Sequence, residues 1–455
     1  MPSDTVFVWG WLLGRTEPVP FGVLTENGGI VGFSYAQSYL ARSDAVPLYD
    51  IPLGTGLRGP PAGMNVHGCF SDVAPDAWGR RVILHRLTGR SGRDAETADL
   101  SLLTYLLESA SYRAGALDFQ SSPTKYEPRG SSASLEEMMS AADRLQAGEA
   151  LSPSLEAALL HGTSIGGARP KAALEDNGRH LIAKFESSSD PYPVVKAEGA
   201  AMTLAAYAGV EVPAVKVVEC LGKSVLLVER FDRTADGGRR MMVSALTVLR
   251  LPEELAHYAS YVDLADQLRS RAADPKADLR QLFSRVTFNI MVSNTDDHAK
   301  NHAAFWDGKS LSLTPAYDIC PQLRSGGEQA QAMAIDRDGW RFSQLEGCVR
   351  AAPNYLLDET EARGLIDYQL EVVRSHWEEA ADIARLTGAE RRRLWGRQIM
   401  NPYCLEGYQP APRRLVGTRP GASSDEVPRC ARCHRPLRSA ESISRGMGPK
   451  CAEQR

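Results

Sequence analysis

The chain has 455 residues and a net charge of −4, and 43% of its residues are hydrophobic while 24% are charged. This length allows two or three domains with cores of their own, and the composition excludes wholesale disorder and nucleic-acid binding by net charge alone. No run approaches the roughly 18 apolar residues of a membrane span. The first fifteen residues lack the basic region of a signal peptide, so we expect a cytoplasmic protein with no membrane partner.

Charge and cysteine are unevenly distributed. Residues 405–455 contain ten Lys or Arg against five Asp or Glu, so this stretch carries +5 and the first 404 residues carry −9. Five cysteines are scattered, as buried thiols of a reduced protein are, whereas Cys430, Cys433 and Cys451 cluster near the end. A basic end on an acidic body predicts a separate module with a partner of its own.

The first 105 residues predict a small α+β subdomain. Short β-like runs at 5–13 and 29–35 alternate with Gly and Pro turns, and a helix is expected over 76–87, where the sequence reads DAWGRRVILHRL.

Residues 106–240 predict the order of a kinase amino-terminal lobe. The elements in chain order are a Gly-rich segment at 161–174, a strand at 180–186, a helix at 194–210 stopped by Gly209, and strands at 214–219 and 224–229. A glycine loop, a strand with a lysine and a helix with a glutamate open such a lobe. Residues 241–404 are mainly helical, as a carboxyl-terminal lobe would be, and residues 405–428 predict a linker rich in Pro, Gly, Arg and Ser.

The segment from Gly162 to Lys171 reads GTSIGGARPK. Its glycines let the backbone approach phosphates, whose charge exposed amides can cradle. It is not a Walker A loop, because Pro170 stands where that motif needs Gly before Lys, and a plain turn is the alternative. The residues predicted to bind a nucleotide here are Ser164, Ile165, Gly166, Gly167, Ala168 and Lys171.

Two further segments are candidates for the nucleotide site. Lys184, in the apolar run LIAKF, is predicted to reach the α- and β-phosphates with Glu198 as its partner; a solvent-facing lysine is the alternative. The run VERFDR would follow a hinge strand, where backbone groups from Glu229 through Arg230 to Phe231 would bind adenine. A strand end with a charged turn is the alternative there.

Residues 294–302 read NTDDHAKNH, and PAYD follows, ending at Asp318. A carboxylate, an amide and a second carboxylate at this spacing are the parts that phosphoryl transfer uses. Asp296 would be the catalytic base, and Asn301 and Asp318 would hold Mg²⁺. His298 and Lys300 would support the loop and the phosphates, and His298 and Tyr317 are added to the nucleotide contacts. Neither Asp297 nor His302 has a predicted role, and a solvent-facing side chain is the interpretation left open for Asp297.

Two other interpretations of NTDDHAKNH stay open. A polar loop or helix cap favours Asn, Thr and Asp. A metal hydrolase could use the D-D-H run and the later His as ligands of Zn²⁺ or Mn²⁺. The upstream Gly-rich loop, Lys184 and VERFDR favour a kinase, because they supply a nucleotide site that a hydrolase would not need.

At these motifs the chain resembles the HipA-like serine/threonine kinases, the toxin half of bacterial type II toxin–antitoxin pairs. The resemblance covers residues 1 to about 400. It rests on the segments FGVLTENG, FSYAQSYL, FSDVAPDAWGRR, SIGGARPK, LIAKF, VERFDR, RVTFNIMVSNTDDHAKNH and TPAYDICP. Taken together in this order, these motifs are highly specific.

The resemblance implies an α+β, bilobal protein-kinase-like fold with an amino-terminal α+β subdomain and a mainly helical second lobe. It implies ATP with Mg²⁺ and autophosphorylation of Ser164, whose added charge would eject the glycine loop. It also implies a HipB-like helix-turn-helix antitoxin, contact with DNA through that antitoxin, and a protein substrate such as an aminoacyl-tRNA synthetase or a translation factor. A catalytically silent nucleotide-binding switch is the alternative function.

The resemblance ends before residues 429–455, which resemble small zinc modules of the C-x-x-C…G-x-G-P-x-C type. Cys430 and Cys433, with Cys451 after seventeen intervening residues, could bind a tetrahedral Zn²⁺, which a piece without a core needs to fold. The fourth ligand is open, since His434 is awkwardly adjacent and Cys404 or an external group could serve. A haem attachment and an unmetallated tail are the alternatives. Arginines of this module would suit nucleic acid or an acidic protein surface.

Overall fold

The computed structural model describes residues 5–88, 100–130, 133–147, 149, 152, 155, 169–187, 190–324 and 326–411. It divides the chain after Pro410, and the description below concerns the part before that point. The predicted site residues that lie outside the described part are Ser164, Ile165, Gly166, Gly167 and Ala168 of the glycine loop and Cys430, Cys433 and Cys451 of the zinc module. The domain boundaries given above stay predictions.

The amino-terminal region is built on an antiparallel sheet with the strand order β3-β2-β1-β4. Its elements are β1 (Thr5–Gly10), β2 (Val19–Asn27), β3 (Ile30–Tyr35), α1 (Gln37–Leu40), α2 (Gly68–Ser71), α3 (Ala77–Thr88), α4 (Leu102–Glu108) and β4 (Leu117–Gln120). Gly28 and Gly29, with φ of 58° and 80°, make the tight turn between β2 and β3. The predicted strand at 29–35 and helix at 76–87 are confirmed, while the strand predicted at 5–13 ends at Gly10.

A second antiparallel sheet, with the order β5-β6-β8-β7, carries the predicted lysine strand. The elements of this part are α5 (Leu135–Ala147), β5 (Lys171–Asp176), β6 (Arg179–Phe185), α7 (Val194–Tyr207), β7 (Val215–Cys220) and β8 (Lys223–Glu229). Asn177 and Gly178, with φ of 51° and 76°, form the turn that joins β5 to β6, as expected for a two-residue hairpin loop. The predictions for β6, α7, β7 and β8 are confirmed, but β5 was not predicted.

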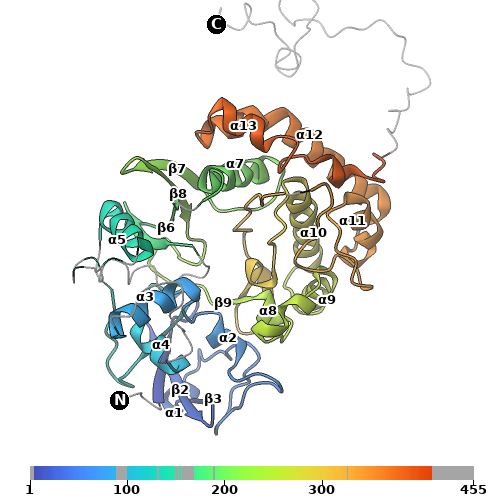
Figure 1. The fold of residues 1–455 in the computed structure, drawn as a ribbon. Coiled ribbons are helices and arrows are strands. Elements are labelled where there is room, and N and C mark those ends of the chain that lie inside the picture. Colours follow the sequence, from blue (N-terminus) through green and yellow to red (C-terminus); the bar gives the residue numbers. More distant parts are fainter. Residues whose placement is uncertain are drawn as a thin grey trace, which may run out of the picture. The chain divides into compact units, whose positions relative to one another are not determined.

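Helices dominate the chain from residue 241 onward, as predicted, around a small sheet with the order β11-β10-β9. The elements are β9 (Met242–Ser244), α8 (Ala245–Val248), η2 (Glu253–Tyr258), α9 (Tyr261–Arg271), α10 (Pro275–Met291), η3 (Ala299–Asn301), β10 (Ala303–Trp306), β11 (Leu311–Leu313), α11 (Leu345–Ala351), η4 (Ala352–Tyr355), α12 (Glu359–Ile383), α13 (Gly388–Leu394) and η5 (Pro402–Leu405). Figure 1 shows α7 beside β7 and β8, which it contacts, and α7 also packs on α12.

Two hydrophobic cores position the candidate site. The larger core joins the first sheet to α7, α10 and α12, and the smaller joins Trp78 and Val82 of α3 to α5 and to the β5–β6 hairpin. Asp274 caps α10 by accepting a hydrogen bond from the Ala277 amide at 3.1 Å, and Pro275 stands at the first turn, where its missing N–H costs nothing. Since α10 ends at Met291, it leads directly into the NTDDHAKNH segment.

Among the residues that the structure describes, no helix is both long enough and apolar enough to cross a membrane.

Candidate active site

Lys184 and Glu198 form an ion pair between β6 and α7. The Lys184 Nζ lies 2.6 Å from the Glu198 Oε1, and their side chains are only 14% and 7% exposed. The alternative of a solvent-facing lysine is therefore wrong. Burial alone lowers the pKa of Lys184, but the carboxylates of Asp318 and Glu198 outweigh burial and hold that pKa above its usual range. The lysine thus stays charged in a nearly dry environment.

Asp318 reaches the same lysine from the PAYD segment, since its Oδ1 accepts a hydrogen bond from the Lys184 Nζ. Its backbone has a φ of 55°, a left-handed conformation that Asp tolerates better than most residues. Burial raises the pKa of Asp318, but the charges of Lys184 and Lys171 lower it by more, so that the net shift is downward. The structure therefore brings together a predicted phosphate-binding lysine, its partner and a predicted metal ligand.

A second lysine lies beside the first on the same sheet. Lys171 begins β5 and stands directly opposite Lys184 in the antiparallel register, so that both side chains share one face. Lys171 is 5% exposed. Burial lowers its pKa, although the carboxylates of Asp318 and Asp76 oppose the shift. Two neighbouring cations facing two carboxylates make a charged cluster at the point where the predicted glycine loop joins the sheet.

Asp297 is the buried anchor of the NTDDHAKNH segment. Its carboxylate accepts hydrogen bonds from the hydroxyl of Tyr261 at 2.7 Å and the amide of Asn289 at 2.7 Å, and its Oδ2 lies 2.9 Å from the Nε2 of His302. Burial raises the pKa of Asp297, but His302 and the hydrogen bonds outweigh burial and lower it. The interpretation that Asp297 faces solvent is wrong, and His302 acquires a role as its partner.

Asp296, one residue earlier, is exposed. Its backbone carbonyl accepts hydrogen bonds from the amide N–H of His298 at 2.9 Å and from the Nδ2 of Asn301 at 3.1 Å. These bonds shape the loop without occupying the carboxylate. Because the side-chain nitrogen of Asn301 is used in this way, its Oδ1 is the atom that remains for a cation, and amide oxygens are among the ligands that Mg²⁺ accepts.

The remaining predicted residues of this loop differ in their surroundings. His298 is half-buried, and its Nδ1 has no hydrogen-bond partner within the described part of the chain. Lys300 is exposed and its Nζ lies 2.7 Å from Glu253. The Tyr317 hydroxyl donates to the Lys300 carbonyl at 2.8 Å, and the Tyr317 ring lies 5.8 Å from that of Phe231. The Lys300 ammonium group is therefore paired with the exposed carboxylate of Glu253, and its predicted role toward the phosphates stays a prediction.

The VERFDR segment is held mainly by its own charged side chains. The amides of Glu229 and Arg230 donate to the carbonyls of Ala214 and His180, both at 2.9 Å, so these two amides are not available to a base. The Arg230 guanidinium is buried and binds Asp232 at 2.7 Å. Backbone carbonyls of residues 112 and 113 also accept hydrogen bonds from it. This anchoring was not predicted, although three charged residues within four positions were a signal for it.

No group of three His, Cys, Asp or Glu side chains within the described residues is arranged to hold a metal ion. The hydrolase interpretation needed Asp297 and a histidine as ligands. Asp297 and His302 instead bind each other in the interior, where both are about 2% exposed.

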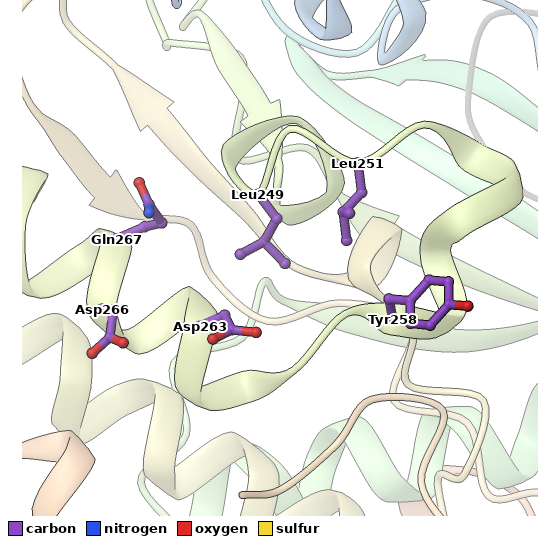
Figure 2. Close-up of a pocket in the computed structure, with 6 residues that line it drawn as sticks. All are labelled: Leu249, Leu251, Tyr258, Asp263, Asp266 and Gln267. Atoms are coloured by element: carbon purple, nitrogen blue, oxygen red, sulfur yellow. The ribbon is translucent and has the colours of Figure 1, made fainter. Parts of the chain in front are cut away.

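A surface pocket lies apart from this cluster, between α8, η2 and α9 (Figure 2). It is lined by Leu249, Leu251, Tyr258, Asp263, Asp266 and Gln267. The Asp266 carboxylate is 2.6 Å from Arg269 and 2.7 Å from Arg337, so this acidic group is already neutralised.

The chain is similar to known proteins in sequence and in fold. Residues 163–377 match the family described as HipA-like C-terminal domain, and residues 420–455 match a family of unknown function, DUF6011. The protein named "Putative kinase Y4mE" from Sinorhizobium fredii is 28% identical over 221 residues, which are 44% of this chain and 50% of that protein. "Serine/threonine-protein kinase toxin HipA" from Shewanella oneidensis is 28% identical over 204 residues, which are 38% of this chain and 46% of that protein. The chain thus spans about half the length of these relatives.

A solved structure of HipA from Shewanella oneidensis, in a complex with HipB and its operator DNA, has the same fold. The TM-score is 0.62 at 19% identity, over 88% of this chain and 98% of that one. The fold class is therefore the α+β, kinase-like one that the sequence predicted. Residues 163–377 thus match the HipA-like C-terminal domain family, and the chain is similar to HipA in sequence over part of its length and in fold.

Proposed function

We propose that the chain is an ATP- and Mg²⁺-dependent protein serine/threonine kinase. The observation that carries this proposal is the meeting of Lys184, Glu198 and Asp318 beside the loop that contains Asp296. A glycine loop, a paired lysine and two polar loops are the parts of a phosphotransfer site.

Each residue then has a defined task. Lys184 and Lys171 attract the phosphates, and Glu198 keeps Lys184 oriented. Asp296, exposed and without a side-chain hydrogen bond to a described residue, takes the proton of the attacking hydroxyl. Asn301 and Asp318 would supply oxygen atoms for Mg²⁺, whose charge would neutralise that of the phosphates. In this structure the Asp318 carboxylate accepts a hydrogen bond from Lys184, so one carboxylate would serve both the lysine and the cation.

The adenine would lie near Phe231 and Tyr317, whose rings are neighbours. Of the hinge residues Glu229, Arg230 and Phe231, the Phe231 amide is the donor we assign to the base, since the other two amides already donate to carbonyls. His298, whose buried Nδ1 has no hydrogen-bond partner among the described residues, is the side chain we assign to orienting the loop or a phosphate oxygen.

We propose further that Ser164 accepts phosphate from the same site. A phosphate there would place about two negative charges in the glycine loop, where they would repel the nucleotide. A HipB-like helix-turn-helix antitoxin, bound to DNA, is the proposed partner, because the solved HipA is in a complex with HipB and its operator. An aminoacyl-tRNA synthetase or a translation factor in the cytoplasm is the proposed substrate class.

The test uses the purified chain with radiolabelled ATP and Mg²⁺, either alone or with a bacterial lysate. We expect transfer to serine or threonine in the wild type and none with Asp296→Asn, while equilibrium dialysis shows ATP bound by both proteins. Transfer by Asp296→Asn would contradict the proposal. Bound ATP without transfer in the wild type would instead favour the catalytically silent switch.

For residues 429–455 the proposal is a zinc module with Cys430, Cys433 and Cys451 as ligands. Metal analysis of the purified chain tests it. One equivalent of zinc, lost with Cys433→Ser, is expected, and its absence from the wild type would contradict the assignment.

A further inference from the structure

A segment of the amino-terminal region, Gly68–Asp76, lies against β9, the strand that pairs with β10 directly after the proposed catalytic loop, residues 294–302. Figure 1 shows α2, which begins this segment, near β9 and α8, and α2 packs on both. The approach is close: a Cβ added at Gly68 would lie 2.4 Å from the Oγ1 of Thr247 and 2.7 Å from its Cγ2. Only glycine fits there without a shift, so the two parts are in tight contact.

Asp72 makes this contact specific. Its carboxylate accepts hydrogen bonds from the backbone N–H of Ser244 at 2.7 Å and from the Ser244 hydroxyl at 2.6 Å. Ser244 ends β9 and caps α8, where its Oγ accepts a hydrogen bond from the Thr247 amide at 3.2 Å. Burial raises the pKa of Asp72, and these hydrogen bonds oppose the shift. One carboxylate from the amino-terminal region thus fixes both the end of β9 and the start of α8.

Ser244 is in direct contact with the end of the catalytic loop. It stands opposite Ala303 in the β9–β10 pairing, and the next amide, that of Ala245, donates to the His302 carbonyl at 2.7 Å. His302 in turn binds Asp297, the buried anchor of the loop. Hydrogen bonds and short stretches of backbone therefore connect Asp72, through Ser244, the Ala245 amide and His302, to Asp297, one residue from the proposed base.

The same segment carries a second carboxylate, Asp76, whose charge interacts with Lys171 and Lys300. The Oδ1 of Asp76 accepts a hydrogen bond from the Gly79 amide at 2.9 Å, and its Oδ2 is buried without a hydrogen-bond partner in the described structure. Burial raises the pKa of Asp76 to about 6, and the charges that oppose this shift are those of Lys171 and Lys300. Asp72 is thus hydrogen-bonded to Ser244, next to the catalytic loop, and Asp76, four residues later, interacts electrostatically with Lys171 of β5.

We propose that the Gly68–Asp76 segment positions the active site, with Asp72 as the positioning residue that holds the catalytic loop through Ser244 and His302. This inference rests on the proposed kinase function. Asp72 contacts neither the proposed base nor a metal ligand, so it acts through the geometry of the loop. A loop displaced by an ångström can lower the rate of the chemical step on the order of 100-fold while leaving nucleotide binding intact.

The test compares Asp72→Asn with Asp118→Asn in the full-length chain. Asp118 is a matched control, because it is a fully buried carboxylate of the same region, where Asp72 is half-buried, and it binds Arg113 and Arg129 with no hydrogen bond to β9 or α8 in the described structure. With Asp72→Asn we expect kcat for phosphate transfer to fall about 10- to 100-fold, with KM for ATP and ATP binding within about twofold of the wild type. With Asp118→Asn we expect a lower Tm but an unchanged kcat for the folded protein. Unchanged kcat in Asp72→Asn, or an equal loss in both variants, would overturn the inference.

Two further measurements keep the test decisive. If Asp72→Asn does not fold, Ser244→Ala removes the hydroxyl but keeps the backbone bond, and it should lower kcat in the same direction by a smaller factor. If the wild type itself transfers no phosphate, the proposed function fails, and the positioning claim is then judged by amide hydrogen exchange. Exchange in residues 294–306 must be faster in Asp72→Asn than in both the wild type and Asp118→Asn, and equal rates would overturn it.

Discussion

The polar cluster around Asp297 and the charged cluster around Lys184 are neighbours in the fold but have opposite character. Asp297 is satisfied by three side-chain partners that all belong to the chain. The second cluster contains two lysines and two carboxylates, and one of these carboxylates, Asp318, is also the proposed metal ligand. A closed network fixes a loop, whereas a cluster of lysines with an exchangeable carboxylate can bind a ligand. The comparison therefore separates residues that hold the loop in place, such as Asp297, from residues proposed to contact the ligand, such as Lys184 and Asp318.

The largest expected effect is on catalysis, at Asp318. Asp318→Ala should reduce phosphate transfer on the order of 1,000-fold, because it removes a proposed metal ligand, while the chain stays folded. Alanine is also strained at a φ of 55°, so Asp318→Asn, which tolerates that conformation, is the matched control for the backbone. Both variants should lose transfer equally, as measured with radiolabelled ATP. Retained transfer in Asp318→Asn would contradict the assignment.

The next effect is on stability, at Asp297. Asp297→Ala should lower the free energy of unfolding by about 3 kcal/mol or more, because it leaves buried donors from Asn289, Tyr261 and His302 without their acceptor. Asp296→Ala, one residue away and exposed, should change it by less than about 0.5 kcal/mol. Denaturant unfolding measures both. If the two variants unfold alike, the distinction between the two clusters is wrong.

A smaller effect is expected on nucleotide affinity, at Lys184. Lys184→Met keeps the apolar stem but removes the charge, and ATP binding should weaken about 30-fold, or about 2 kcal/mol. Lys223→Met is the control, since Lys223 pairs with Asp143 at 2.7 Å at the start of β8. Equilibrium dialysis with ATP should show a loss only for Lys184→Met. Equal affinity in the two variants would remove Lys184 from the site.

The smallest effect is a pH dependence that Asp76 produces. Its folded pKa of about 6 lies above its ordinary value of 3.8, with Lys171 and Lys300 as the charged groups that face it. Protonated Asp76 therefore makes its full contribution to the free energy of unfolding below about pH 4. This contribution is lost as the pH rises through about 6. The difference between pH 5 and pH 7 is about 1 kcal/mol. Asp76→Asn should unfold with a smaller change over this range, and an unchanged profile would show that Asp76 is not the titrating group.

The sequence predicted the fold well where local pattern carries the information. The lysine strand β6, the helix α7 with Glu198 and the hinge strand β8 follow from turn residues and periodicity, and the order of these elements predicted the pairing of Lys184 with Glu198. The β5 strand was missed because its first residues continue a Gly-rich segment that favours a loop.

The roles of the adjacent carboxylates Asp296 and Asp297 could not be predicted from the sequence. A shift of one position along the chain exchanges the buried side chain and the exposed one. A signal existed in Asn289, a polar residue in the apolar run TFNIM, because a buried amide requires a partner. The link from Asp72 to Ser244 spans 172 positions, and no local pattern reveals such a contact.

The central claim is that Asp296 is the base of a protein kinase, and phosphoproteomics after expressing the wild type and Asp296→Asn in parallel tests it most directly. The account predicts phosphoserine and phosphothreonine sites that appear with the wild type alone, Ser164 of the chain among them. The same set of sites in both cultures would contradict it.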